Sequence, residues 1–391
     1  MPRRICVVTT SRADFGPLSS VMRSIRDDPA LRLQVIVSGM HLMPRFGNTW
    51  REIEQSHLRI TARVPMPMAG KSPLDNLKAM GTGLRRFGDS FAELKPHLLV
   101  LLGDRTEILI PALAALVLGI PVAHIHGGEL TEGAIDDSIR HAVTKLASLH
   151  FAATEDYRRR IIQMGESPHR VFNVGAPGLD QIYASTPLSR SELEKQIRFS
   201  LEPPVALITW HPVTRVSSAD CSAQLQSFVR AVKSSGVRAI ITAANSDANG
   251  NKINNQLRNL CSKFPERFHW APHLGHHRYL SCLAHCRLMI GNSSSGLTEA
   301  PSFRLPVVNI GDRQRGRVRA PNVIDVPCDE GAILRGIRRA LSPRFHRSLA
   351  GMQNPYDRYG DGRTGERIRN VLRDVSLDCE FLRKEFHDLR E

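Results

Sequence analysis

Residues 124–141 read HIHGGELTEGAIDDSIRH. The apolar run before them ends like a buried strand, and Ile135, Ile139 and Val143 then follow with the period of an amphipathic helix. Gly127 and Gly128 allow a sharp turn or the close approach of a ligand. The stretch is therefore predicted to be a strand-to-helix junction. Open α/β sheets bind ligands at the carboxyl ends of their strands, which is where this junction lies.

The same stretch gathers three histidines, four acids and an arginine. Asp136 lies one helical turn before Arg140, and Asp137 one turn before His141. Both aspartates fall in the first turn, where the helix dipole favours negative charge. A capped helix with two local ion pairs would also explain the pattern. The density of titratable groups favours a functional site.

The bulk composition indicates two globular domains with a basic surface. The chain has 391 residues and a formal net charge of +15, from 53 Lys and Arg and 38 Asp and Glu. Arginine carries most of the excess, which suits phosphate recognition but also fits a biased genome composition. No basic block interleaved with aromatic residues is present, so nucleic acid is not favoured as a partner. A small anionic substrate is enough to explain a basic site.

The cysteines and the apolar runs indicate a cytoplasmic protein. The seven cysteines show no CxxC or Cys/His ligand spacing, so we expect a reducing compartment, no structural disulfide and no metal site. Cys282 and Cys286 are expected to be core residues. No signal-peptide pattern begins the chain. Pro111, Gly119 and Pro121 interrupt the apolar run 108–125, which predicts a buried helix and strand rather than a membrane span.

The first half continues as alternating strands and helices. Residues 4–10 form a predicted strand, and the loop after it carries Arg12 where a dinucleotide-binding protein would carry GxGxxG, which argues against NAD. Arg12 is predicted to bind phosphate, or else to pair with Asp14. The strand at 97–102 ends at Asp104 and Arg105, which suit catalysis and phosphate binding; alternatively Asp104 is a helix cap.

The second half repeats the pattern, with strands at 205–210, 239–242, 288–290 and 307–310. After the third of these, residues 291–296 read GNSSSG at the start of an expected helix, which predicts a diphosphate cradle without a Walker A lysine. Glu299 is placed to accept hydrogen bonds from a ribose. A serine-rich turn with a helix cap is the alternative. Residues 184–203 are predicted to be a linker, and 43–72 show little pattern.

Five motifs in order resemble the hydrolysing UDP-N-acetylglucosamine 2-epimerases. They are Ser11-Arg12-Ala13-Asp14, Gly103-Asp104-Arg105, the run from Gly127 to His141, Trp210-His211-Pro212-Val213-Thr214 and Ile290-Gly291-Asn292-Ser293-Ser294. The resemblance implies an α/β fold of GT-B architecture, with two Rossmann-like domains facing across a cleft. It implies an N-terminal domain at 1–183, a C-terminal domain at 184–364 and a helical segment at 365–391 that packs back on the N-terminal domain.

The resemblance also implies roles for individual residues. Catalysis is assigned to Asp104, His126, Glu129, Asp136, Arg140 and His211. Nucleotide binding is assigned to Arg12, Arg105, His211, Asn245, Ser293, Ser294, Glu299 and Arg313. The implied reaction uses no cofactor and no metal: a base removes the proton at C2 as UDP leaves C1, and water adds to the resulting glycal. The product is a free manno-configured N-acetyl sugar for nonulosonic acid synthesis.

His126 departs from the several family members that carry glutamate at this place. A His-Ile-His-Gly-Gly-Glu variant is found in relatives that act on 2,4-diacetamido sugars of the legionaminic acid type, so UDP-GlcNAc and a UDP-linked diacetamido sugar both stay open as substrates. The alternatives are a GDP-linked diacetamido donor and a GT-B glycosyltransferase. A non-catalytic nucleotide-sugar-binding protein would not need Asp104 and Asp136. The expected partners are the nucleotide sugar and further copies of the chain, with no nucleic acid and no membrane.

Overall fold

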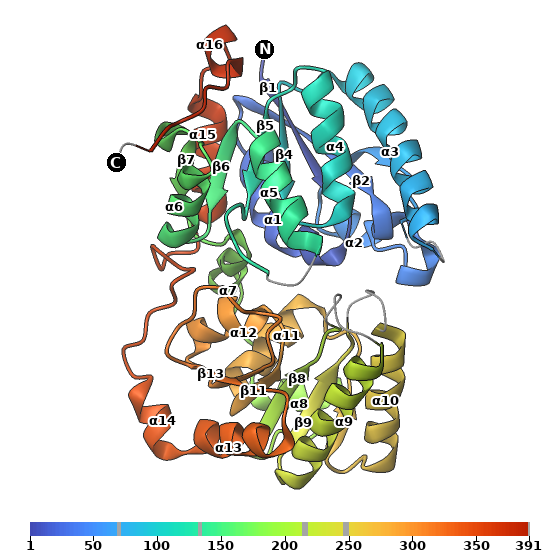
Figure 1. Cartoon of the computed structure of the whole chain (residues 1–391), viewed down its shortest axis with the longest axis vertical. Helices are drawn as coiled ribbons and strands as arrows, with labels where there is room; N and C mark the ends of the chain where they lie inside the picture. The colour runs from blue at the N-terminus through green and yellow to red at the C-terminus, as the bar shows by residue number, and fades with distance from the viewer. Residues whose placement is uncertain (69–71, 132–134, 213–217, 245–249, 390–391) are drawn as a thin grey trace. The chain divides into compact units, whose positions relative to one another are not determined.

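The computed structural model describes residues 1–68, 72–131, 135–212, 218–244 and 250–389. The chain divides into two compact units (Figure 1). Unit 1 contains Met1–Glu129, Asp136–Ala184 and Arg358–Glu391, and unit 2 contains Leu130–Ile135 and Ser185–Asp357. The chain therefore returns to unit 1 after completing unit 2.

Unit 1 is built on a parallel sheet that, over the described residues, has seven strands in the order β3-β2-β1-β4-β5-β6-β7. Its strands are β1 (Arg3–Thr9), β2 (Leu31–Ser38), β3 (Ile60–Val64), β4 (Leu98–Leu102), β5 (Val122–Ile125), β6 (Leu149–Ala152) and β7 (Val171–Asn173). Strand β4 is the apolar run LLVLL and is buried throughout, as expected of a central parallel strand covered on both faces.

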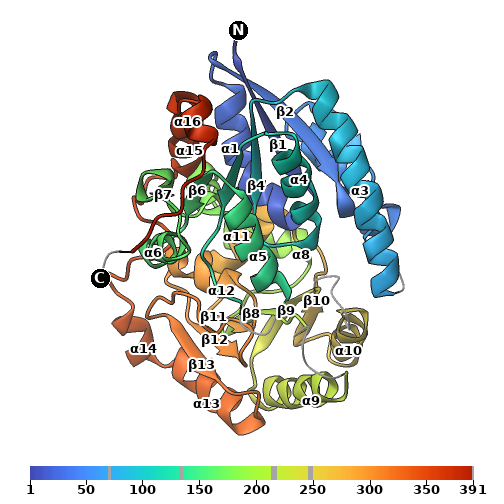
Figure 2. The same ribbon diagram turned by 45° about the horizontal axis from the view of Figure 1, so that its top comes forward.

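Helices cover both faces of this sheet. They are α1 (Arg12–Arg26), α2 (Trp50–Gln55), α3 (Pro73–Leu94), α4 (Thr106–Val117), α5 (Ile135–Leu146), α6 (Glu155–Gln163), α7 (Asp180–Ala184), α15 (Thr364–Asp374) and α16 (Cys379–Leu382), with 3-10 turns η1 (Gly39–Leu42), η2 (Pro44–Phe46), η3 (Pro168–Arg170) and η4 (Pro177–Leu179). One hydrophobic cluster joins α3, α4 and α5 to the sheet. A second joins α1, α2 and α15 to the other face. Figure 2 shows α15 beside α1, and Ile368 and Leu372 of α15 are fully buried in that cluster.

Unit 2 repeats the design with strand order β10-β9-β8-β11-β12-β13. Its strands are β8 (Val205–Thr209), β9 (Arg238–Thr242), β10 (Phe268–Trp270), β11 (Leu288–Gly291), β12 (Val307–Ile310) and β13 (Val323–Val326). Its helices are α8 (Arg190–Ile197), α9 (Ser218–Ser234), α10 (Gly250–Lys263), α11 (Gly275–His285), α12 (Ser295–Thr298), α13 (Glu330–Leu341) and α14 (Pro343–Ser348), with the 3-10 turn η5 (Ala300–Phe303). Both units have the strand order of a Rossmann-like fold.

The sheet register brings the functional loops of each unit to one edge. In unit 1, Leu102 pairs with Ile125, and Ile125 pairs with Phe151, so β4, β5 and β6 end side by side. In unit 2, Thr209 of β8 pairs with Gly291 of β11. The residues that follow these strands are therefore neighbours within each unit.

Several predicted elements need correction. The stretch 43–72 contains helix α2 and the edge strand β3. Residues 184–203 contain α8, which begins with a capping box in which the Ser189 amide donates to Glu192 Oε2 at 2.9 Å and the Glu192 amide donates to Ser189 Oγ at 3.4 Å. Strand β13 and helix α13 were not predicted. The helix expected after GNSSSG is the four-residue α12, followed by η5. The short and polar elements among these carry little apolar periodicity, whereas α13 buries Ile333, Ile337 and Ala340 on one face, a helical signal that was present in the sequence and was missed.

Candidate active site

Asp104 and Arg140 form the centre of the unit 1 site. Arg140 lies on α5 with 1% of its side chain exposed, and its guanidinium donates to the Asp104 carboxylate. The same guanidinium donates to Asp137 Oδ1 at 3.2 Å and to the carbonyl of Glu129 at 2.8 Å. A buried charge is tolerated when it is paired and hydrogen-bonded, as here. Asp104 is not the helix cap of α4, because the N-cap is Arg105.

His126 and Glu129 form a second pair at the carboxyl end of β5. His126 Nδ1 lies 2.5 Å from Glu129 Oε1. A carboxylate accepts, so Nδ1 carries a hydrogen and, in the neutral ring, Nε2 carries the lone pair. His126 adopts φ +66°, the left-handed region that a side chain seldom occupies outside functional or turn positions. The fold therefore holds this histidine in one tautomer and one direction.

His124 connects the two strand ends to α5. Its side chain is fully buried, with Nε2 2.7 Å from the carbonyl of Gly103 and Nδ1 3.1 Å from Thr144 Oγ1. Burial lowers its pKa to about 3, so the ring is neutral at physiological pH. Because a carbonyl only accepts, Nε2 carries the hydrogen. His124 thus ties the turn that bears Asp104 to the helix that bears Arg140, although it was not among the predicted site residues.

The glycine pair packs against α6. Gly128 has φ +76°, and a Cβ there would lie 2.4 Å from the carbonyl oxygen of Tyr157. Arg160 of α6 donates to the Gly128 carbonyl. Close approach of two backbones, rather than a turn alone, is what requires glycine at this position.

Asp136, Asp137 and His141 lie on the first two turns of α5, all half-buried. Asp137 contacts both Arg140 and His141, the latter with Nε2 to Oδ2 at 3.6 Å. Burial, together with Arg140 and Arg160, lowers the pKa of His141 despite Asp137. Of the two local ion pairs considered as the alternative interpretation, Asp137 with His141 is present as a contact, and Asp136 lies beside it on the same helix end.

The two arginines predicted to bind phosphate have acidic neighbours in unit 1. Arg12 is exposed and bonds through Nε to Glu52 of α2 at 2.8 Å. The alternative pairing with Asp14 is wrong, because Asp14 is buried and accepts from Thr10 and Ser11 backbone amides at 3.0 Å. Arg105 lies 3.4 Å from Glu107. The Arg12–Glu52 pair is exposed, and an exposed ion pair is weak enough to be exchanged for a phosphate, whereas Glu107 is buried.

In unit 2, His211 is locked to the β11 turn by Asn292. The Asn292 side chain, 1% exposed, accepts from the His211 amide at 2.7 Å and donates to the His211 carbonyl at 2.8 Å. Burial, then Arg313, lowers the pKa of His211 to about 3. His211 is therefore neutral near pH 7. Arg313 donates to the Asn292 carbonyl at 3.2 Å and brings the positive charge to this turn.

The serine-rich turn packs closely against the end of β8 and against Tyr279. Gly291 has φ +140°, and a Cβ there would lie 2.0 Å from the carbonyl oxygen of Thr209. Ser293 and Ser294 are half-buried beside it, and Ser295 accepts from the Tyr279 hydroxyl at 2.7 Å. Glu299 accepts a hydrogen bond from Thr298. Asn245, Val213 and Thr214 lie outside the described residues.

The remaining predicted features are simple to place. All seven cysteines are free, with Cys282 and Cys286 buried as expected. Within the described part of the chain, no group of three or more His, Cys, Asp or Glu side chains is arranged to hold a metal ion. None of the helices in the described ranges is long and apolar enough to cross a membrane.

Sequence reasoning missed Asn292, Gln314, Glu52 and His124. Gln314 donates to the Asn292 carbonyl at 2.8 Å beside Arg313. Asn292 and His124 stand inside motifs that were singled out, so their position was a usable signal. Glu52 lies 40 residues from Arg12, in a stretch with little pattern.

Comparisons with known proteins identify the family of the chain. A family profile described as UDP-N-acetylglucosamine 2-epimerase matches residues 23–373. The hydrolysing GDP/UDP-N,N'-diacetylbacillosamine 2-epimerase of Campylobacter jejuni is 38% identical, covering 99% of both chains, and the hydrolysing UDP-N,N'-diacetylbacillosamine 2-epimerase of Legionella pneumophila is 37% identical, covering 98% of this chain and 99% of its own. Polysialic acid biosynthesis protein P7 of Escherichia coli is 33% identical, covering 100% of this chain and 98% of its own. The structure of UDP-GlcNAc 2-epimerase from Neisseria meningitidis bound to UDP-GlcNAc superposes with a TM-score of 0.80 at 17% identity, over 94% of this chain and 99% of that one.

Proposed function

The chain belongs to the UDP-N-acetylglucosamine 2-epimerase family and is a hydrolysing nucleotide-sugar 2-epimerase with a GT-B-type fold, and we propose that its substrate is a UDP-linked 2,4-diacetamido-2,4,6-trideoxyhexose. The names of the Campylobacter and Legionella relatives support this choice of sugar. His126, in the His-Ile-His-Gly-Gly-Glu form of the motif, also supports it through the resemblance. The glycosyltransferase alternative loses its support.

The observation that carries the proposed chemistry is the cluster at the ends of β4 and β5. Arg140 bonds Asp104 and the Glu129 carbonyl, while the Glu129 side chain holds His126 Nδ1. A carboxylate and an imidazole held at neighbouring strand ends, connected through Arg140 and Glu129, are groups that can take a proton from one face of a carbon and return one to the other.

In the proposed reaction, a base in this cluster takes the proton from C2. The electrons of the C2–H bond form the C1–C2 double bond, and the C1–O bond breaks so that its electron pair leaves with UDP. Water then adds, with its hydroxyl to C1 and a proton to C2 on the opposite face. We assign proton transfer to His126 and Asp104, with Arg140 and Glu129 as positioning residues and Asp136 beside them.

We assign nucleotide binding to the serine-rich turn of unit 2. Ser293 and Ser294 offer hydroxyl groups, Arg313 offers charge, and neutral His211 offers a ring N–H to the departing diphosphate. Glu299 is proposed to accept a hydrogen bond from the ribose, and Arg12, Arg105 and Asn245 are proposed to complete the nucleotide contacts.

We also propose domain limits at 183 and 364, with the helical segment 365–391 packed on the N-terminal domain. The proposal further includes an assembly of several copies, a cytoplasmic location and a place in nonulosonic acid synthesis.

The substrate choice is tested by measuring nucleotide release from three donors: UDP-N,N'-diacetylbacillosamine, its GDP analogue and UDP-GlcNAc. We expect kcat/KM for the UDP-diacetamido donor to exceed that for UDP-GlcNAc by more than about tenfold, since a site built for a polar substituent discriminates against its absence. Faster release from UDP-GlcNAc would refute the sugar assignment. Faster release from the GDP donor would refute the base assignment.

A further inference from the structure

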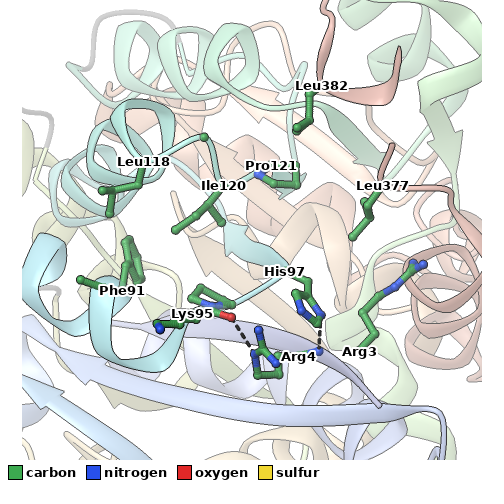
Figure 3. Close-up of a pocket in the computed structure, with 13 residues that line it drawn as sticks. Arg3, Arg4, Phe91, Lys95, His97, Leu118, Ile120, Pro121, Leu377 and Leu382 are labelled. Atoms are coloured by element: carbon green, nitrogen blue, oxygen red, sulfur yellow. Dashed lines mark hydrogen bonds between the residues drawn. The ribbon is translucent and has the colours of Figure 1, made fainter. Parts of the chain in front are cut away.

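A cavity lies at the edge of the unit 1 sheet opposite to the candidate active site. It has a volume of about 620 Å³ and is lined from the first residues of β1, the α3–β4 turn, the α4–β5 turn and the C-terminal segment (Figure 3). The carboxyl ends of β1, β4 and β5 carry Arg12, Asp104 and His126 after them, whereas this cavity meets their amino ends. It is therefore separate from the site described above.

One side of the cavity is basic. Arg3, Arg4, Lys95 and His97 line it, and no acidic side chain is among the described residues of the lining. Arg4 Nε donates to the Lys95 carbonyl at 2.6 Å, and the Arg4 amide donates to His97 Nδ1 at 3.1 Å. These bonds fix Arg4 beside Lys95 and place the ring hydrogen of neutral His97 on Nε2.

The surroundings keep this side positive. Burial, then Arg4 and Arg3, lowers the pKa of His97, as expected where the local potential is positive. Arg3 donates to the carbonyl of Leu372 at 2.7 Å. Asp374 is the acid whose charge raises the pKa of Arg3, and its carboxylate is itself paired with Arg373 at 2.7 Å.

The other side is apolar. Figure 3 shows Leu118, Ile120, Pro121 and Leu382 across the hollow from the basic side chains, with Leu377 beside Arg3. Leu118 and Leu382 are each 47% exposed, which is unusual for large apolar side chains that share one hollow.

The C-terminal part of this wall is anchored. Phe381, next to Leu382, is buried in the core of unit 1, and Arg170 donates to its carbonyl at 2.8 Å. The Arg170 guanidinium also lies 4.7 Å from the centre of the Phe381 ring. The wall is therefore a built part of unit 1 rather than a passing contact.

We propose that this cavity binds a small organic phosphate monoester with an aromatic or apolar body. The volume lies within the range of about 300–1,000 Å³ that is typical of small-molecule sites. Arginine beside lysine matches a phosphate head, because both donate charge-assisted hydrogen bonds. The leucine and isoleucine side chains opposite match a body that water solvates poorly.

The test is titration calorimetry of the full chain with 1-naphthyl phosphate, in the presence of saturating UDP so that the proposed nucleotide site is filled. Inorganic phosphate and 1-naphthol are the two half-ligand probes. One naphthyl phosphate per chain, binding at least tenfold more tightly than either half, is the expected result. Absence of binding, or equal binding of inorganic phosphate alone, overturns the proposal.

Matched variants locate the site. The double variant Arg4→Gln/Lys95→Gln should weaken binding at least tenfold. Arg32→Gln is the control and should leave binding unchanged, because Arg32 is the exposed residue of β2 that pairs with Arg4 in the sheet and does not line the cavity. Leu118→Glu should abolish binding, whereas Leu116→Glu should not, because Leu116 is 54% exposed but does not line the cavity.

Thermal unfolding checks that each of these variants is folded. Binding unchanged by the cavity variants, or lost equally in the controls, overturns the assignment. A change from one oligomeric state to another in Leu118→Glu, with binding retained, would show that a second copy covers the cavity and would also overturn it.

Discussion

Glu166 joins three segments of unit 1 and should control their stability against acid. Its carboxylate, 3% exposed, accepts from Lys145 of α5 at 2.6 Å, lies 3.0 Å from His150 Nε2 of β6 and contacts Lys384 of the C-terminal segment at 2.9 Å. Burial alone would raise its pKa, but the bonds from His150, Lys145 and Lys384 outweigh it and lower the pKa from 4.5 to about 2. Replacement by glutamine keeps the shape and removes the charge.

The magnitude follows from that pKa. Each pKa unit corresponds to about 1.4 kcal/mol, so ionised Glu166 contributes about 3 kcal/mol to the free energy of unfolding at pH 7. Because the folded pKa lies below the unfolded one, the contribution is complete above about pH 5 and falls to less than half by about pH 3. His150 also makes the folded state less stable as the pH falls. Burial lowers its pKa, so at acidic pH the unfolded state binds a proton on this ring more readily than the folded state does.

The assay is urea unfolding of the wild type and Glu166→Gln at pH 7, 5, 4 and 3. We expect the variant to lose about 3 kcal/mol at pH 7, with the difference narrowing as the pH falls. Glu385→Gln, next to Lys384 and exposed, should change stability by less than about 0.5 kcal/mol. An unchanged Glu166→Gln protein at pH 7, or a gap that is as large at pH 3, would refute the reasoning.

Three further outcomes are expected from the two sites. Asp104→Asn should lower kcat by about 10²- to 10³-fold in steady-state UDP release, whereas exposed Asp156→Asn should leave it unchanged. His126→Gln should lower kcat by about 10²-fold; a variant that keeps the wild-type kcat would exclude His126 from proton transfer. Gly291→Ala should lower the free energy of unfolding by more than about 2 kcal/mol, since its Cβ would meet Thr209, whereas Gly311→Ala, with φ +73° but open space, should cost less.

The central strands were predictable because they are buried on both faces. The runs at 98–102 and 205–208 are continuously apolar, and each was predicted to be a strand followed by polar residues. Strand β3, at the sheet edge, alternates half-buried and exposed residues and includes Arg63, so its pattern was too polar to identify. Strand β13 was not predicted for the same reason, because its four residues include the exposed Asp325.

The candidate site followed from a rule about sheets, but its contacts did not. Parallel strands end at one edge, which placed Asp104 near His126 from sequence alone. The pairing of Arg12 with Glu52 and of Asn292 with His211 joins residues 40 and 81 positions apart, and no local pattern encodes such contacts. The neutral state of His211 depends on burial, which is likewise set by the fold.

Proton NMR of the reaction in deuterated buffer, with UDP-N,N'-diacetylbacillosamine as donor, tests the central claim most directly. The account predicts release of UDP with a free manno-configured sugar that carries deuterium at C2, and it predicts that Asp104→Asn and His126→Gln slow this exchange. Release of UDP with the C2 proton retained, or return of an epimerised nucleotide sugar without release, would contradict elimination and rehydration at this site.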